Sequence, residues 1–228
     1  MKLPLLLSVP HGSLDIPPEV KDYCVLTEEE VRRDGDEGAT EIYDLSSECE
    51  GFAAAGVARA IVDLNRAEDD RRKDGVVKTH TCWDVPVYDP FPPEGVVREL
   101  LDHYYRPYHE RLSRLSEGAV TLGIDCHTMA AAAPPIGPDP GRERPALCLS
   151  SADGTLPEEW LLKLAGCLRE TFGTAPSLND PFRGGHIIRS HAGELPWVQL
   201  EVSRAPTHSL PEKRERVLEA FRRFCSRI

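Results

Sequence analysis

The sequence lacks several features that identify whole classes of protein. Its 228 residues contain no apolar run close to the roughly 20 residues that a membrane-spanning helix needs. They also contain no CxxC pair and no internal repeat. These absences exclude a helical membrane span, a metal or redox site built on a CxxC motif, and a repeat architecture.

A basic surface is absent as well. Lysine and arginine together number 27 against 38 aspartates and glutamates, which gives a formal net charge of −11. Nucleic acids and anionic membranes bind basic surfaces. We therefore expect neither nucleic acid nor a membrane among the partners of this protein.

The cysteines and the N-terminal segment indicate a cytoplasmic protein. The seven cysteines are scattered, and their odd number fits reduced thiols better than a disulfide framework. The start, MKLPLLLSVPHG, superficially suggests a secretion signal, but its apolar part is short and no small-residue cleavage site follows. We expect residues 1–228 to form a single domain, because a chain of this length can bury one full core.

The sequence does contain an alternation of short apolar runs and helical patterns. The apolar runs predict strands at residues 3–9, 57–64, 120–129, 146–150 and 197–202. The helical patterns predict helices at residues 28–33, 39–49, 94–116, 158–170 and 209–224, with capping boxes at Thr27/Glu30 and Thr155/Glu158 and a helix start at Ser209-x-Pro211-Glu212. Alternation of this kind is typical of an α/β fold.

Polar side chains stand at the ends of several predicted strands. His11 follows the first strand, and Asn65 with Arg66 follows the strand predicted at residues 57–64. His127 lies near the end of the strand at residues 120–129, and Glu201 near the end of the strand at residues 197–202. Open α/β sheets bind ligands at the carboxyl ends of their strands, so we expect these side chains to meet at one sheet edge.

The residue types at this edge suggest metal-dependent chemistry. Two imidazoles and one carboxylate are a ligand set that a catalytic zinc ion prefers, and zinc activates water near neutral pH. Glu201 is suited to take a proton from that water, and the planar guanidinium of Arg66 is suited to bind a substrate carboxylate. Gly184 and Gly185 permit a close backbone approach nearby.

Each of these residues also has an ordinary structural interpretation. The acidic cluster of Asp34, Asp36 and Glu37 can serve as the charged start of a helix. A lone glutamate such as Glu201 is often a surface group, and Asp125 can simply hold the imidazole of His127 or cap the backbone.

Two further features have structural interpretations of their own. His103 and His109 lie on the long predicted helix, where a surface or packed imidazole is the favoured interpretation. The small-residue, proline-rich segment 130–145 is either a surface loop or a lid over the site.

Seven motifs occur in the order found in the N-formylglutamate amidohydrolase family, and the chain resembles that family from about residue 8 to residue 204. They are SVPHGS, RRDGDEG, VDLNR, YRPYHERL, GIDCHTM, GGHIIR and VQLEV. The resemblance implies a three-layer α/β/α fold with a mixed central sheet, similar to zinc carboxypeptidases and aspartoacylases and phosphorylase/hydrolase-like in architecture.

The resemblance also implies roles for particular residues. His11 and His127 would be zinc ligands, with Asp36 as the third ligand and Asp34 and Glu37 as its rivals. Glu201 would be the catalytic base and acid. Asn65 and Arg66 match a DxNR element that also resembles the carboxylate-binding element of aspartoacylases, which implies a role in substrate binding.

The implied activity is zinc-dependent hydrolysis of an N-acyl amino acid, with N-formylglutamate, a compound of histidine degradation, as the first candidate. Some residues depart from the family pattern, such as His11-Gly12-Ser13 in place of the more frequent HSG. Two alternatives therefore stay open: a deacylase for another N-acyl amino acid or small peptide, and a non-catalytic relative that binds a small anion.

Overall fold

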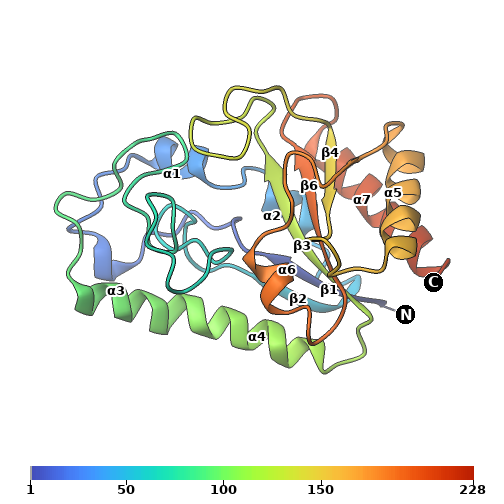
Figure 1. Cartoon of the computed structure of the whole chain (residues 1–228), viewed down its shortest axis with the longest axis horizontal. Helices are drawn as coiled ribbons and strands as arrows, with labels where there is room; N and C mark the ends of the chain where they lie inside the picture. Colours follow the sequence, from blue (N-terminus) through green and yellow to red (C-terminus); the bar gives the residue numbers. More distant parts are fainter. Residues whose placement is uncertain (1) are drawn as a thin grey trace.

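The computed structural model describes residues 2–228 and is built around a six-stranded sheet (Figure 1). The strands are β1 (Leu3–Val9), β2 (Cys49–Ala54), β3 (Leu122–Met129), β4 (Leu147–Ser150), β5 (Ser177–Leu178) and β6 (Trp197–Ser203). Their order in the sheet is β2-β1-β3-β6-β4-β5. All neighbours are parallel except β4 and β6, which are antiparallel, so the sheet is mixed.

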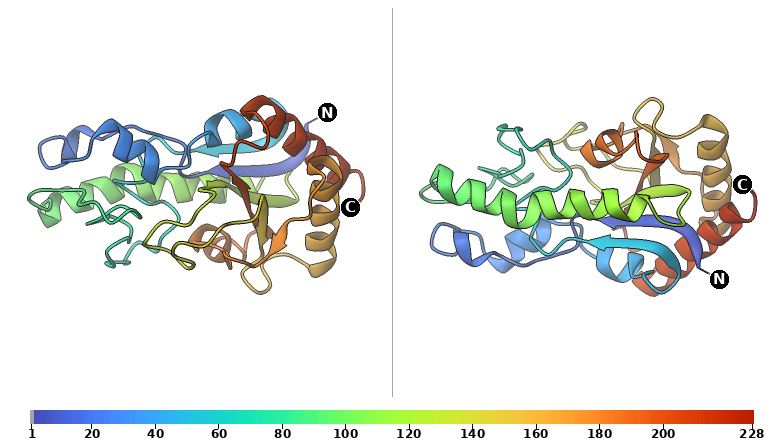
Figure 2. Two further views of the ribbon diagram at one scale, coloured as in Figure 1. Left: turned by 90° about the horizontal axis from the view of Figure 1, so that it is seen from above. Right: turned by 90° about the horizontal axis from the view of Figure 1, so that it is seen from below.

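Helices cover both faces of the sheet (Figure 2). One face packs against α2 (Ala39–Tyr43), α5 (Glu158–Phe172) and α7 (Leu210–Cys225). The other face packs against a long helix that consists of α3 (Glu94–Leu100), a π-helical turn (Leu101–Tyr105) and α4 (Arg106–Ser116), and against α6 (His186–Ser190). A short 3-10 turn (Pro18–Val20) and α1 (Glu28–Asp34) complete the elements.

The predicted three-layer α/β/α architecture with a mixed sheet is confirmed. Strands β1, β3, β4 and β6 lie where the apolar runs predicted them, and the long helical pattern is helical throughout. The seven cysteines are free thiols. Within residues 2–228, every helix is too short or too polar to span a lipid bilayer.

The strand predicted at residues 57–64 was wrong. This segment forms turns, with the N–H groups of Ile61 and Val62 donating to the carbonyl of Ala58. Its apolar side chains are buried, but they pack as a loop beneath the long helix. A short apolar run indicates only that its side chains are buried. Burial does not distinguish a strand from a loop that is covered by a helix.

The helix predicted at residues 39–49 was also wrong in its second half. Helix α2 ends at Tyr43, and the edge strand β2 begins at Cys49. β2 reads CEGFAA, which has few of the β-branched residues that favour strands. A Cβ added to Gly51 would lie 2.8 Å from the side chain of Leu6 on β1, so the glycine permits the close pairing of these strands.

Two of the three helix starts expected from capping motifs have a capping box. Thr27 with Glu30 caps α1, and Ser209 with Glu212 caps α7. The box predicted at Thr155 and Glu158 is absent, because the Thr155 hydroxyl donates instead to backbone carbonyls, including that of Trp197 in β6. Tertiary hydrogen bonding has replaced the local motif here.

The topology places the carboxyl ends of β1, β3 and β6 next to one another. His11 follows β1 directly, and His127 of β3 pairs in register with Glu201 of β6. Parallel neighbours bring their carboxyl ends to the same edge, and three of the polar strand ends therefore meet as expected.

Candidate metal centre and cleft

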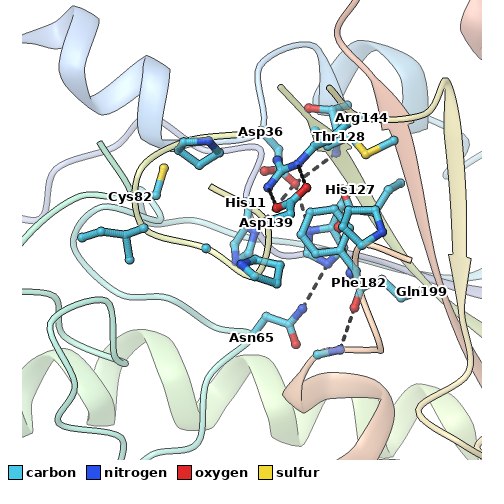
Figure 3. A pocket seen from close by; sticks show the side chains of 18 of the residues that line it. His11, Asp36, Asn65, Cys82, His127, Thr128, Asp139, Arg144, Phe182 and Gln199 are labelled. Carbon is cyan, nitrogen blue, oxygen red and sulfur yellow. Dashed lines mark hydrogen bonds and ion pairs between the residues drawn. The ribbon is translucent and has the colours of Figure 1, made fainter. Parts of the chain in front are cut away.

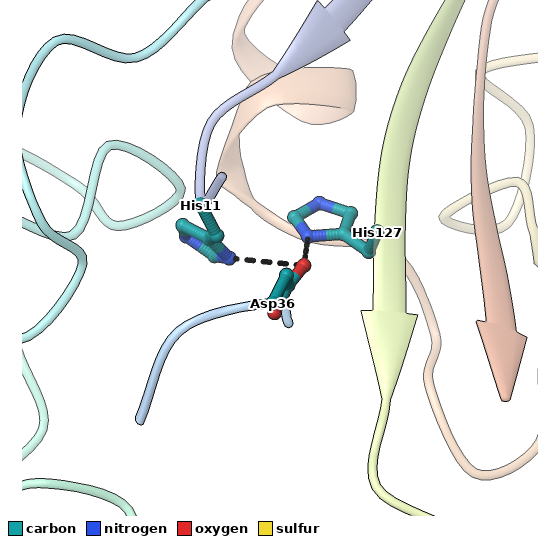
Figure 4. Close-up of side chains that lie close together, drawn as sticks. All are labelled: His11, Asp36 and His127. Carbon is teal, nitrogen blue, oxygen red and sulfur yellow. Dashed lines mark hydrogen bonds and ion pairs between the residues drawn. The ribbon is translucent and has the colours of Figure 1, made fainter. Parts of the chain in front are cut away.

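His11, Asp36 and His127 converge at this edge of the sheet (Figure 4). Their nearest ligand atoms all lie within 4.8 Å of one another, and all three side chains are buried. Nδ1 of His127 is 2.9 Å from Oδ2 of Asp36, and Nδ1 of His11 is 3.7 Å from the same oxygen. Two ring nitrogens thus face a single carboxylate oxygen.

The far nitrogen of each imidazole is held by another buried carboxylate. Nε2 of His11 donates to Oδ1 of Asp63 at 2.8 Å, and Nε2 of His127 donates to Oδ2 of Asp125 at 2.8 Å. In a neutral ring, a proton held on Nε2 by these hydrogen bonds would leave the lone pair of Nδ1 directed toward Asp36.

The donor set fits a divalent metal ion. Two imidazole lone pairs and a carboxylate oxygen in one buried pocket repel one another unless a cation or a proton lies between them. Histidine ligands of metals also usually donate their other ring nitrogen to a carboxylate, as both rings do here. His11, Asp36 and His127 could therefore bind a metal, and zinc accepts this combination of nitrogen and oxygen ligands.

The two rivals of Asp36 lie in other environments. Asp34 is fully buried, with Oδ2 2.9 Å from Nζ of Lys78, and its Oδ1 accepts the N–H of Cys82. Glu37 is exposed. Of the three acidic residues, Asp36 alone belongs to the cluster with both histidines.

Two cationic side chains lie next to Asp63, the carboxylate that contacts His11. Asp63 is fully buried, and its Oδ2 lies 3.2 Å from Nε of Arg59 and 3.6 Å from Nζ of Lys78. Burial alone would raise the pKa of Asp63, but His11 and the surrounding cations hold it well below its usual range. Asp63 therefore stays ionised and holds the ring of His11 in place.

Glu201 lies beside the metal ligands on the neighbouring strand. It is buried, and its Oε1 accepts a hydrogen bond from Nε2 of Gln199 at 2.8 Å. Burial raises the pKa of Glu201 to about 6, although His127 partly opposes this shift. A carboxylate with a pKa in this range can both accept and return a proton near neutral pH.

Asn65 and Arg66, which were predicted to bind substrate, both line the cleft but are already engaged. Nδ2 of Asn65 donates to Oδ2 of Asp125, and its Oδ1 accepts the N–H of Ile187 in α6. Arg66 donates from Nε and Nη2 to Asp74. Asn65 thus ties Asp125 to α6, and Arg66 faces the cleft in an ion pair.

The glycine pair fits closely against this arrangement. A Cβ added to Gly185 would lie 2.3 Å from Nδ2 of Asn65, and the Gly185 N–H donates to Oε1 of Gln199 at 2.7 Å. The expected close backbone approach at Gly184 and Gly185 is confirmed. It orients Gln199, which in turn holds Glu201.

The cluster opens into a cleft of about 540 Å³ (Figure 3). Segment 130–145 forms part of its wall through residues including Ile136 and Asp139. Arg144 donates to both oxygens of Asp139, and its guanidinium lies 4.8 Å from the ring centre of Phe182. The segment is therefore anchored across the cleft, and its opening as a lid stays a prediction.

Sequence reasoning missed several residues that shape the site. Asp63 and Lys78 are charged residues next to apolar runs, and a charge in such a position is a signal of a buried ion pair. Arg204 also lines the cleft, directly after β6. Its position directly after a predicted strand was the signal that could have identified it.

Comparison with known proteins supports the resemblance that the motifs indicated. Residues 3–206 match a family model described as N-formylglutamate amidohydrolase. An N-formylglutamate deformylase of Pseudomonas putida is 30% identical over 224 residues, which cover 90% of this chain and 81% of that protein. The corresponding deformylase of Pseudomonas aeruginosa is 29% identical over 220 residues, covering 89% and 81%.

A solved structure shares the fold. The crystal structure of N-formylglutamate amidohydrolase from Ralstonia eutropha superimposes with a TM-score of 0.83 and 21% identity, covering 100% of this chain and 94% of that chain. At this identity the match supports the architecture alone.

Proposed function

The chain belongs to the N-formylglutamate amidohydrolase family, and from this premise we propose that it is a zinc-dependent hydrolase that cleaves the amide bond of an N-acyl amino acid. N-formylglutamate is the first candidate substrate, because both similar Pseudomonas proteins are N-formylglutamate deformylases. Its hydrolysis would give formate and glutamate.

The observation that carries the proposal is the convergence of His11, Asp36 and His127 with both Nε2 atoms held by buried carboxylates. A metal ion bound by these three residues would polarise the amide carbonyl and make water a better nucleophile near neutral pH. The remaining steps fall to the side chains of the chain itself.

In the proposal, Glu201 moves the protons. It lies in register with His127 on the adjacent strand, and burial raises its pKa to about 6. As a base, its carboxylate takes a proton from the attacking water. As an acid, it returns that proton to the amine nitrogen when the carbon–nitrogen bond breaks.

Arg66 lies at the cleft and presents a guanidinium to it. In the proposal this group orients one carboxylate of the substrate, in exchange for part of its contact with Asp74. Asn65 contributes by holding Asp125, and through it the ring of His127.

The test combines metal analysis with product detection. The purified protein is expected to contain zinc and to release formate from N-formylglutamate, and chelation should abolish formate release until zinc is returned. A panel of formyl, acetyl and succinyl amino acids then identifies the acyl group. Protein without metal, and without activity after zinc is added, would contradict the proposal and favour a non-catalytic anion-binding protein.

A further inference from the structure

The motif YRPYHERL, residues 105–112, lies on the long helix and has no role in the hydrolytic steps. It begins where the π-helical turn ends, and turns of this kind are frequent at functional sites. Tyr105 and His109 are four residues apart and therefore lie on the same face of the helix. Tyr105 is buried, and the centres of the two rings are 4.4 Å apart. Their polar groups can therefore reach the same neighbouring segment.

That segment is the turn that carries Asn65 and Arg66. The hydroxyl of Tyr105 donates to the carbonyl of Arg66 at 2.8 Å. Nε2 of His109 lies 3.0 Å from the carbonyl of Leu64. The helix therefore holds the backbone immediately before and immediately after Asn65, whose side chain extends toward the metal cluster (Figure 3).

The other side of this turn is held near the metal cluster. Residues 63–66 form neither helix nor strand. The N–H of Asn65 donates to Oδ1 of Asp63, and the N–H of Arg66 donates to the carbonyl of Asp63. A functional side chain on a loop keeps its geometry only when the surrounding hydrogen bonds support it. The position of Arg66 in the cleft therefore depends on contacts from both sides.

Two further side chains hold the ring of His109. Its Nδ1 lies 2.9 Å from Nε2 of His191, and Nδ1 of His191 lies 2.9 Å from Oε2 of Glu194. The other oxygen of Glu194 accepts a hydrogen bond from the hydroxyl of Ser113 at 2.6 Å. The two imidazoles are nearly parallel and their centres are 5.2 Å apart, as expected for rings joined edge to edge by a hydrogen bond. Glu194 and His191 thus fix the plane of the His109 ring.

The number of protons in this chain determines its charge. The carbonyl of Leu64 and the carboxylate of Glu194 stand at its ends, and both accept hydrogen bonds. Three hydrogen bonds need three protons, whereas two neutral imidazoles carry only two. All three contacts can be hydrogen bonds only if one extra proton is present, and a carboxylate favours a cation beside it. The chain is then complete with a neutral His109, protonated on Nε2, and a cationic His191.

We infer that Tyr105 and His109 are positioning residues, which hold the turn of Asn65 and Arg66 in place for the substrate. The two side chains behind His109 keep its Nε2 proton directed at this turn. The inference rests on the proposed hydrolytic function of the cleft, and it gives the long helix a part in that function. The hydrogen bonds of both residues go to the turn and not to the metal ligands, so their loss should weaken substrate binding more than turnover.

The first test is Tyr105→Phe, which removes one hydroxyl and keeps the ring. KM for N-formylglutamate should rise by about 2- to 10-fold, the range of one neutral hydrogen bond, with kcat and zinc content little changed. Tyr104→Phe is the matched control, because the neighbouring hydroxyl of Tyr104 contacts Glu19 instead. Its KM should equal that of the wild type.

A double-mutant cycle shows whether Tyr105 acts through Arg66. Arg66→Gln alone should raise KM, and adding Tyr105→Phe to it should cause little further change, since the group that Tyr105 positions is then absent. The inference would be overturned by losses that multiply in the double variant, or by a KM of Tyr105→Phe equal to that of Tyr104→Phe.

The histidine chain gives a second readout, which does not depend on activity. In protein with ¹⁵N-labelled histidine, NMR at neutral pH should show His109 as a neutral ring protonated on Nε2 and His191 as a ring protonated on both nitrogens. His109→Leu should raise KM, and His109→Gln should recover part of the loss, because its amide N–H can reach the carbonyl of Leu64. A proton on Nδ1 of a neutral His109 would contradict the inference.

These measurements also separate the inference from the proposed function. If the wild type releases no formate, the hydrolytic function fails, and calorimetric affinity for glutamate replaces KM in the same comparisons. Equal affinities of Tyr105→Phe and Tyr104→Phe would then overturn the inference. Thermal unfolding checks that each variant is folded.

Discussion

Nζ of Lys78 lies 2.9 Å from Oδ2 of Asp34, and both side chains are completely buried. The same ammonium is 3.6 Å from Oδ2 of Asp63, the carboxylate that holds His11. A lysine without solvent access thus balances two aspartates directly behind the candidate metal centre. This relationship links the stability of the fold to the geometry of the site.

Removal of the buried ammonium should destabilise the protein strongly. Lys78→Met leaves Asp34 and Asp63 with less compensation, and breaking a buried ion pair on one side costs about 3–5 kcal/mol. Urea unfolding at neutral pH measures the loss. Lys163→Met, at a lysine of α5 that pairs with Glu159 at the surface, serves as the control and should unfold at nearly the wild-type urea concentration. An unfolding midpoint of Lys78→Met equal to that of this control would show that the buried pair contributes little.

The carboxylate behind His11 should tune metal affinity. Asp63→Asn replaces the charged acceptor of the His11 Nε2–H, and loss of such a partner typically lowers metal affinity about 10- to 100-fold. Competition against a chelator of known affinity measures the change. Asp44→Asn, at an exposed position after α2, is the matched control. Equal zinc affinity in the two variants would remove Asp63 from this supporting role.

Substitution of the proposed base should separate turnover from metal binding. Glu201→Gln cannot accept a proton, so kcat is expected to fall by a factor of about 10² to 10⁴ while the zinc content stays the same. Formate release and elemental analysis are measured on one preparation. Glu219→Gln on α7, where Glu219 pairs with Arg223, should retain wild-type kcat. Glu201 would lose the base role if its glutamine variant kept full turnover.

His109 should make the fold sensitive to mild acid. Burial, together with the nearby His191 and His186, lowers the pKa of His109 to about 4. Nε2 of His109 donates to the carbonyl of Leu64, and its Nδ1 accepts a hydrogen bond from Nε2 of His191. The neutral ring is therefore the form that the folded protein accommodates.

The sign of the effect follows from the depressed pKa. In the unfolded chain His109 takes up a proton below about pH 6.5, whereas in the folded chain it does so only near pH 4. The contribution of the neutral ring to the free energy of unfolding is therefore complete above pH 6.5. It decreases as the pH falls from 6.5 to 4, by up to about 3 kcal/mol. Unfolding free energies from pH 7 to pH 4 should show this loss in the wild type and less of it in His109→Gln. His103→Gln, on the exposed side of the same helix, should keep the wild-type slope.

Local patterns in the sequence determined much of the fold. The apolar runs of β1, β3 and β6 predicted buried strands correctly, and the long helical pattern specifies its own conformation, because helix periodicity is a short-range property. The same runs end in His11, His127 and Glu201, so the residue types of the site could be predicted together with the edge at which they lie.

The sequence does not distinguish between neighbouring residues of the same chemistry, and the tertiary structure decides which of them joins the candidate metal cluster. Asp34, Asp36 and Glu37 are all acidic, but a backbone hydrogen bond from Asp36 to the carbonyl of His11 turns Asp36 toward the histidines. Lys78, which follows far along the chain, draws Asp34 away from them. Residues 57–64 form a buried loop for a similar reason, since the long helix that covers them comes later in the sequence. These outcomes depend on contacts between distant segments, which no local pattern encodes.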